Sequence, residues 1–216
     1  MVVMADKSVP TSDHIRDIIS FVEASPTSYH AVAELTRRLE QAGFQRLEET
    51  ESWPSVEGRR YVVRDGAVIA WITPEKVTPQ LGARIVGSHT DSPSFKLKPN
   101  ATVTNQGWQQ VGMEVYGGGL LNSWLDRDLG LSGRLVTCDG QAHLVRTGPI
   151  LRISQLAPHL DRTVNDDLKL DRQRHLMPIL SVGKPDLERT VYLRGWPLGA
   201  VPLAILVGAA ALLLVH

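Results

Sequence analysis

The spacing of apolar residues predicts two helices near the start of the chain. Ser12 can cap the first, and apolar residues then recur three or four positions apart, as on one face of a helix. This stripe consists of Ile15, Ile18, Ile19 and Val22. Ser25-Pro26 ends the pattern, because the residue before a proline avoids the helical conformation. Ser28 can cap a second helix that stops at Gly43. Its inward-facing residues are expected to be Tyr29, Val32, Leu35 and Leu39.

Strand-like sequence follows between residues 58 and 73. The segments 60–63 and 67–72 flank Asp65-Gly66, a turn sequence typical of a β-hairpin. The short apolar run 83–86 is expected to form a buried strand that leads into the polar segment 87–93. Two helices, a hairpin and a buried strand favour an α/β layer structure.

After Lys98 the sequence predicts a second, mostly β unit. Its apolar runs are short and separated by turn residues, which is typical of antiparallel strands. The expected strands are 111–116, 131–137, 143–146 and 150–153. The polar stretch 159–171 is expected to be a loop, and 175–182 is a brief apolar run.

Composition and charge narrow the function classes. The apolar fraction of 43% and the charged fraction of 21% are ordinary for a globular protein. Lys plus Arg and Asp plus Glu balance at 23 each, which gives no electrostatic case for nucleic acid binding. Cys138 is the single cysteine, so a cysteine-rich zinc cluster is excluded and a reducing, cytoplasmic setting fits. Residues 1–11 contain Asp6 and Lys7 and are not expected to be a secretory signal.

The end of the chain is apolar. Residues 196–215 contain no charged side chain, and a helix of about 20 residues would span roughly 30 Å, the thickness of a bilayer core. Arg189 and Arg194 precede this tail and would keep the preceding part cytoplasmic. Three interpretations are open: a frameshift or truncation product, which is favoured, a membrane attachment, and a buried apolar segment.

The most informative polar residues are His89 and Asp91. Neutral imidazole is a good zinc ligand, and a carboxylate can orient the ring and raise its basicity. In a strand, residues two apart point to the same side, so the pair could converge on one point. The pattern His-x-Asp also occurs often by chance, and a structural role is the alternative.

Several ordered motifs give the chain a resemblance to a known family. The chain resembles the aspartyl aminopeptidase family of zinc metallopeptidases, over about residues 12 to 187. The motifs that carry the resemblance are 25–30 (SPTSYH), 87–93 (GSHTDSP), 109–119, 124–129 (WLDRDL), 149–153 (PILRI), Leu156 with His159, and 175–180 (HLMPIL).

The resemblance implies an architecture and an activity. Residues 1–97 would be the N-terminal part of a catalytic α/β domain, residues 98–187 part of an inserted β-rich dimerisation domain, and residues 188–216 an apolar tail outside the family pattern. Such enzymes remove N-terminal residues, typically acidic ones, from peptides with two Zn²⁺ ions per site, and they assemble into large homo-oligomers.

The resemblance also implies roles for individual residues. His89 matches a zinc ligand, Asp91 the carboxylate that supports this ligand, and His159 a histidine that reaches a neighbouring subunit's active site. The remaining ligands and the general-base glutamate would lie in a second half of the catalytic domain, which nothing after Asp186 resembles. This polypeptide alone is therefore expected to be inactive, and a non-catalytic oligomerisation module or an unstable fragment are the alternatives.

Other acidic residues and histidines have ordinary explanations. Asp126 and Asp128 flank Arg127, which favours a salt-bridged turn over a metal site. His30 follows an aromatic residue on a predicted helix, where packing or capping is favoured.

Overall fold

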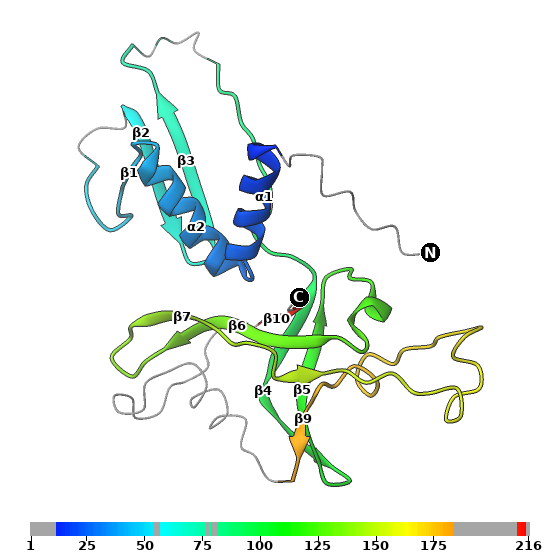
Figure 1. Ribbon diagram of the computed structural model, residues 1–216. Helices are drawn as coiled ribbons and strands as arrows, with labels where there is room; N and C mark the ends of the chain where they lie inside the picture. Colours follow the sequence, from blue (N-terminus) through cyan, green and yellow to red (C-terminus); the bar gives the residue numbers. More distant parts are fainter. Residues whose placement is uncertain (1–11, 54–56, 77, 79–81, 184–210, 215–216) are drawn as a thin grey trace. The chain divides into compact units, whose positions relative to one another are not determined.

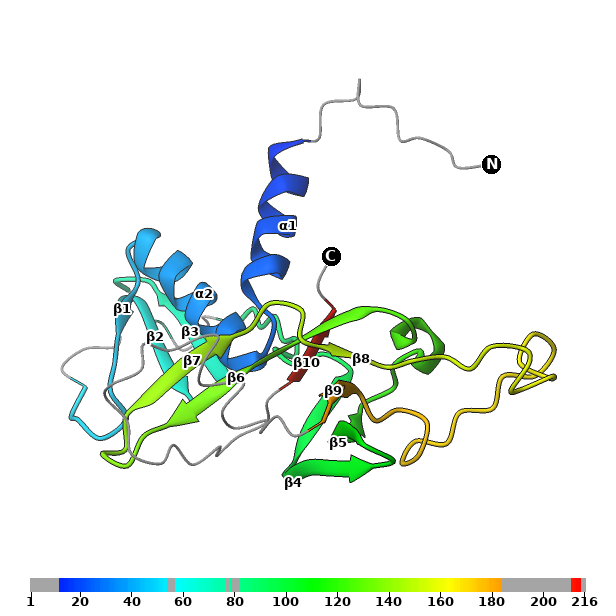
Figure 2. The same ribbon diagram turned by 60° about the horizontal axis from the view of Figure 1, so that its bottom comes forward.

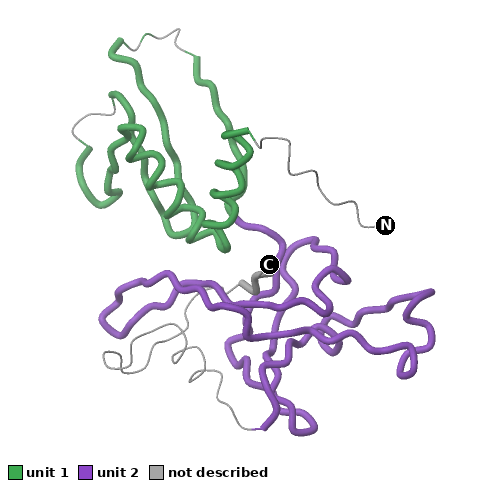
Figure 3. The backbone as a smooth tube through the Cα atoms, viewed as in Figure 1, with its two compact units in different colours: residues 1–90 green, residues 91–216 purple. Residues whose placement is uncertain are grey.

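The chain folds into two compact units. The computed structural model describes residues 12–53, 57–76, 78, 82–183 and 211–214 of the 216 residues. The first unit comprises residues 1–90 and the second residues 91–216 (Figure 3). The structure thus divides within the motif 87–93.

The two predicted helices are present in unit 1 (Figure 1). Helix α1 spans Asp13–Ala24, and the Ser12 side chain caps it by accepting from the backbone N–H of Ile15. Helix α2 spans Ser28–Gln41, and its cap is Thr27, one residue earlier than expected. Thr27 is the N-cap because its Oγ1 accepts a hydrogen bond from the backbone N–H of His30, three residues later. Ser28 already belongs to the first turn of the helix.

A three-stranded sheet completes unit 1. Its strands are β1 (Gln45–Arg46), β2 (Gly58–Arg64) and β3 (Ala67–Thr73), in the order β1-β2-β3. The predicted hairpin is confirmed, with β2 and β3 antiparallel around the turn at residues 65–66. Tyr61 of β2 is fully buried, and its hydroxyl donates to Glu40 of α2 at 2.7 Å. Helix α2 therefore anchors to the face of the hairpin that carries Tyr61.

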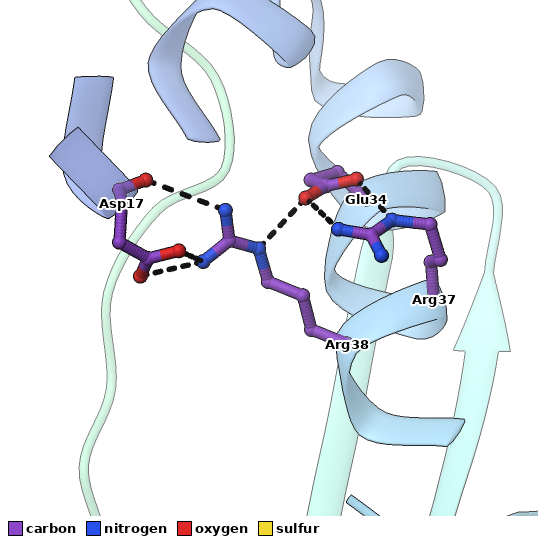
Figure 4. Close-up of polar contacts among 4 residues, drawn as sticks. All are labelled: Asp17, Glu34, Arg37 and Arg38. Carbon is purple, nitrogen blue, oxygen red and sulfur yellow. Dashed lines mark hydrogen bonds and ion pairs between the residues drawn. The ribbon is translucent and has the colours of Figure 1, made fainter. Parts of the chain in front are cut away.

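An ionic cluster joins α1 to α2 (Figure 4). Arg38 of α2 donates to both carboxylate oxygens of Asp17 on α1, each at 2.8 Å, and to Glu34 at 2.7 Å. Arg37 makes two further bonds to Glu34, at 2.6 and 2.7 Å. These two guanidinium groups lower the pKa of Glu34 to about 2. A shared network of this kind fixes the two helices more firmly than isolated surface pairs do.

The apolar stripe of α1 is exposed. Helix α1 has no buried residue, and its four stripe residues are 48–64% exposed. The pattern therefore predicted the helix correctly, but no described part of the chain buries the apolar face.

The expected buried strand at 83–86 is not formed. Residues 82–89 belong to no strand of the described chain, and Ile85 and Val86 are 88% and 99% exposed. The prediction is wrong for this structure because a strand requires a neighbour to satisfy its backbone groups. No described segment pairs with these residues.

Unit 2 is a curled antiparallel sheet. Its strands run in the order β10-β4-β5-β9-β8-β6-β7, and β10 also pairs with β6. Figure 2 shows β10 as the red strand, which pairs with both β4 and β6. The strands are β4 (Ser94–Asn105), β5 (Trp108–Tyr116), β6 (Asp128–Val136), β7 (Ala142–Arg146), β8 (Leu151–Arg152), β9 (Ile179–Val182) and β10 (Ala211–Leu214), with a 3-10 turn η1 (Leu121–Trp124). The strands expected from the sequence are confirmed, although β8 is shorter.

The core of unit 2 lies inside this curl. Phe95 packs edge-on against Trp124, with the ring centroids 4.8 Å apart. The buried apolar residues are Phe95, Ala101, Val111, Met113, Leu125, Leu129, Leu131, Leu151, Ile153 and Leu176. Because Leu176 comes from the connection between β8 and β9, that long connection is anchored in the core at its end.

The apolar tail lies mostly outside the described residues. Its described part, 211–214, is strand β10 rather than helix. Within the part of the chain that the structure describes, no helix is long and apolar enough to span a bilayer.

Replacing Glu34 with Gln is expected to destabilise unit 1 at neutral pH but not in strong acid. The pKa of the Glu34 carboxyl falls from 4.5 to about 2 on folding. Because the pKa of Glu34 is lower in the folded state than in the unfolded state, ionised Glu34 stabilises the folded state at pH values above the unfolded-state pKa. This stabilisation is lost as the pH falls toward the folded-state pKa. We expect a difference of about 1 kcal/mol at neutral pH, after allowance for solvent screening.

Urea unfolding followed by far-UV circular dichroism measures this difference, since both described helices belong to unit 1. Glu75→Gln, in the exposed segment 74–76, is the matched control and should unfold like the wild type. A destabilisation by Glu34→Gln that stays the same in strong acid would contradict the electrostatic explanation.

Candidate functional site

The motif 87–93 spans the division between the units. His89 belongs to unit 1 and is exposed, and Asp91 belongs to unit 2 and is half-buried. Because residues 82–89 are not a strand, the alternation expected to bring the two side chains to one side does not apply. Each residue is positioned by its own unit.

In unit 1, a hydrogen bond to the hairpin turn holds the residue next to His89. The Thr90 hydroxyl donates to the carbonyl oxygen of Gly66 at 2.6 Å. Gly66 in turn lies against the start of α2, since a Cβ built on it would be 2.6 Å from Ser28 Oγ and 3.0 Å from Ser28 Cβ. Glycine suits this position because a side chain would press on that of Ser28. The hairpin turn thus links the motif 25–30 to the motif 87–93.

In unit 2, the end of β5 holds Asp91. The Tyr116 hydroxyl donates to Asp91 Oδ2, and this carboxylate raises the pKa of Tyr116. The Lys96 ammonium lies over the Tyr116 ring, 3.4 Å from its centroid, a cation–π contact. Gly117 follows with φ of 75°, and a Cβ on it would meet Pro93 at 3.2 to 3.3 Å. The segment 91–93 is therefore fixed against the end of β5.

His159 lies far along the chain from both residues, in the connection between β8 and β9. It occupies a turn at residues 158–160 and is exposed. Leu156 and Leu160 on either side are 54% and 76% exposed. Figure 1 shows the connection extending from the sheet of unit 2 as a yellow arm. An exposed imidazole on a projecting loop is accessible to another molecule.

The described residues do not by themselves form a zinc centre. No group of three or more His, Cys, Asp or Glu side chains with metal-binding geometry occurs among them. A catalytic zinc needs three protein ligands, and a two-metal site needs a bridging carboxylate as well. His89 and Asp91 supply one imidazole and one carboxylate, so the described residues do not fit a dinuclear site on their own.

The remaining candidates have structural roles. Asp128 binds Arg152 of β8 at 3.1 Å, and Asp126 lies 3.8 Å from the same guanidinium. The salt-bridged turn is confirmed, with Arg152 rather than Arg127 as the partner. His30 Nδ1 lies 2.8 Å from Thr27 Oγ1, within the cap of α2, as the capping interpretation expects.

Sequence reasoning missed Tyr116 as the partner of Asp91. The two residues are 25 positions apart, and no local pattern joins them. The one available signal is that Tyr116 lies in the motif 109–119 that carries the family resemblance.

The comparisons with known proteins define a class, the zinc metallopeptidases. Residues 21–191 match the family described as aminopeptidase I zinc metalloprotease (M18). The chain belongs to the M18 family.

The relatives show how much of the family this chain represents. It is 55% identical over 172 residues to a probable M18 family aminopeptidase 2 of Streptomyces avermitilis, a match covering 79% of this chain and 40% of that protein. A probable aspartyl aminopeptidase of Ricinus communis is 40% identical, covering 81% and 38%. The chain thus spans about 40% of the length of these curated relatives.

Solved structures agree with the fold. The mApe1 structure of Chaetomium thermophilum matches with a TM-score of 0.77 and 27% identity, over 92% of this chain and 50% of that one. The mApe1 dodecamer of S. cerevisiae matches with a TM-score of 0.64 and 28% identity, over 82% and 40%.

Gly66→Ala is expected to destabilise unit 1. The new Cβ would lie 2.6 Å from Ser28 Oγ and 3.0 Å from Ser28 Cβ, so the serine hydroxyl must rotate away and its Cβ must shift slightly. Overpacking of this kind costs about 1–3 kcal/mol. Urea unfolding followed by far-UV circular dichroism measures the loss. Gly87→Ala is the control, because nothing lies within 4 Å of a Cβ there, and equal stability of the two variants would refute the contact.

Asp91→Asn is expected to lower the pKa of Tyr116 toward its ordinary value. The hydrogen bond and the negative charge of Asp91 are the two largest causes of the raised pKa, and an amide keeps the shape without the charge. Titration of tyrosinate absorbance measures this, and Tyr116→Phe identifies the transition. Tyr61, whose pKa burial and Glu40 raise to about 12, should be unaffected. An unchanged Tyr116 titration would refute the contact.

Proposed function

We propose that this chain supplies part of the active centre of a zinc aminopeptidase that removes N-terminal, acidic residues from peptides. The observation that carries the proposal is the family match over residues 21–191, which includes the whole motif 87–93. The Ricinus communis relative, named a probable aspartyl aminopeptidase, supports the acidic preference.

The surroundings of each residue suit the role proposed for it. His89 is exposed and can reach an ion, and its neighbour Thr90 is tied to the hairpin turn. Asp91 accepts a hydrogen bond from Tyr116, which fixes one oxygen and supports an orienting role toward the ligand. His159 lies on the exposed connection between β8 and β9, where its imidazole could donate to a developing charge across an interface.

We further propose a homo-oligomer built through unit 2. The S. cerevisiae relative of known structure is a dodecamer. The arm between β8 and β9 exposes Leu156 and Leu160 beside His159, which are suitable for burial against a second subunit. A cytoplasmic location belongs to the same proposal.

A second function is favoured by one observation. Because the described residues contain no three-ligand metal group, the chain could act as an oligomerisation module that carries no catalysis of its own. Zinc content distinguishes the aminopeptidase from the oligomerisation module, since a module without its own metal site should purify without stoichiometric zinc.

A chimera tests the aminopeptidase proposal. Residues 21–191 of this chain replace the matching stretch of the Streptomyces avermitilis relative, and the product is assayed with aspartyl and glutamyl chromogenic substrates. We expect zinc-dependent turnover in the chimera, whereas the 216-residue chain alone should not exceed a metal-only blank. The chain lacks a three-ligand group in its described residues, which is the physical reason for this difference.

Variants of the chimera test the individual roles. His89→Ala should weaken zinc affinity and lower kcat/KM, each by about 100-fold, since ligand loss affects metal affinity directly. His159→Ala should lower kcat without changing zinc content. His143→Ala, on β7, is the matched control and should behave like the parent. Full activity of the His89→Ala chimera would refute the proposed role, and an inactive chimera with normal fold would refute the function.

A further inference from the structure

Strand β10 lies outside the stretch that the family model matches. The match ends at residue 191, whereas β10 spans Ala211–Leu214. The other strands of unit 2 that the structure describes all lie within residues 91–191. The four residues of β10, Ala-Leu-Leu-Leu, belong to the uncharged tail 196–215. One strand of this sheet therefore comes from sequence that the family model does not account for.

The position of β10 closes the sheet of unit 2 (Figure 2). Among the described residues β4 and β6 do not pair with each other, and β10 pairs antiparallel with both. The pairing with β6 is the longer one, from Ala211 opposite Ser132 to Leu214 opposite Leu129. Without β10, these edges of β4 and β6 would have no partner in the described sheet.

Hydrogen bonds show that Leu129 and Leu131 of β6 direct their backbone groups away from β10. The Leu129 carbonyl oxygen accepts the N–H of Ile150 at 2.9 Å. The Leu131 N–H donates to Thr147 Oγ1 at 2.9 Å, and its carbonyl oxygen accepts the N–H of Thr147 at 2.8 Å. Thr147 and Ile150 belong to the connection between β7 and β8, so these two leucines use that edge of β6.

Gly130 and Ser132 are therefore the residues of β6 that face β10. Successive residues of a strand direct their backbone groups to opposite edges, and Leu213 and Ala211 stand directly across from these two. Ser132 is only 1% exposed, so water is not at hand to replace a lost partner of its backbone. The amides of Gly130 and Ser132 thus report whether the segment 211–214 is in place.

The two strands that β10 joins carry the core of unit 2. Phe95 of β4 is 1% exposed, and Leu129 and Leu131 of β6 are 0% and 5% exposed. A gap in the sheet between these strands would expose a free edge on each side and admit water to this core. A strand at this place is therefore required for the burial that the structure shows.

We propose that the gap between β4 and β6 is a strand-binding site, and that its ligand is the segment 211–214 of the same chain. Binding through main-chain hydrogen bonds tolerates many sequences, which is how a segment outside the family pattern can serve here. Of the three open interpretations of the tail, this one selects the buried segment. The same backbone cannot pair with two strands and also complete a helix across a bilayer. The inference does not depend on the proposed aminopeptidase activity.

The connection to β10 allows binding within one chain. Strand β9 ends at Val182, so residues 183–210 lie between the two strands. An extended chain covers roughly 3.3 Å per residue, whereas neighbouring strands are roughly 5 Å apart, so this length is ample. A tethered segment also has a high effective concentration at its site. The tail of a second copy is the competing ligand in the test.

Hydrogen exchange of the full chain, followed by NMR, tests the site. In the wild type, the amides of Gly130 and Ser132 should exchange about as slowly as that of Leu131, which Thr147 holds. Leu213→Pro removes the N–H opposite Gly130 and should speed exchange at both reporting amides by at least about tenfold.

Two controls accompany this variant. Amides of β2 in unit 1 should exchange as in the wild type. Ala157→Pro places a proline in an exposed, non-strand position of unit 2 and should leave Gly130 and Ser132 unchanged. The residue before Pro158 is already restricted to extended conformations, which proline also adopts.

A peptide tests the site directly. A chain that ends at residue 210 is combined with a synthetic peptide of residues 207–216 that carries an N-terminal lysine tag for solubility. The peptide should restore slow exchange at Gly130 and Ser132, and the same peptide with Leu213→Pro should not. If the shortened chain aggregates, refolding with each peptide and measuring the soluble yield gives the same comparison.

Several outcomes would overturn the inference. They are fast exchange of both amides in the wild type, unchanged exchange in Leu213→Pro, and equal effects of the two peptides. Exchange that becomes faster on dilution would assign the strand to a second copy and would overturn binding within one chain. Flotation of the wild type with phosphatidylcholine vesicles, together with fast exchange at Gly130, would overturn it in favour of membrane attachment.

Discussion

An apolar face or a free strand edge is stable in water only when another element covers it, and this constraint distinguishes the two units. Unit 2 satisfies it by curling its sheet until β10 pairs with both β4 and β6, around a core that includes Phe95 and Leu129. Unit 1 satisfies it on one side only. Helix α2 packs on the hairpin through Tyr61, while no described residue covers the stripe of α1 or pairs with the outer edge of β3.

The candidate site brings together fewer ligands among the described residues than a zinc centre needs. The motif 87–93 is held at two points, by Thr90 on the hairpin turn and by Asp91 on Tyr116. These contacts hold the segment that carries the His89 imidazole and the Asp91 carboxylate. A zinc centre needs more ligands than the described residues bring together. The chain spans about 40% of the length of the Streptomyces avermitilis relative.

Local patterns predicted the elements that depend on near neighbours. The hairpin followed from Asp65-Gly66 between strand-like runs, and α1 followed from its stripe and from Ser12. The cap of α2 was placed one residue late, because Thr27 and Ser28 are equally suitable by sequence and the backbone decided between them. The prediction of a strand at 83–86 was wrong, since a strand depends on a pairing partner that a local pattern does not contain.

The sequence by itself determined the helices, the hairpin, the β-rich character of unit 2 and the family, because these depend on periodicity, turn chemistry and ordered motifs. Only the tertiary structure decided that Tyr116 holds Asp91, that Gly66 lies against the Ser28 side chain, and which apolar residues are exposed. The physical reason is distance along the chain. Whether two residues 25 or more positions apart come into contact depends on the path of the backbone between them. That path is set by the packing of the whole fold.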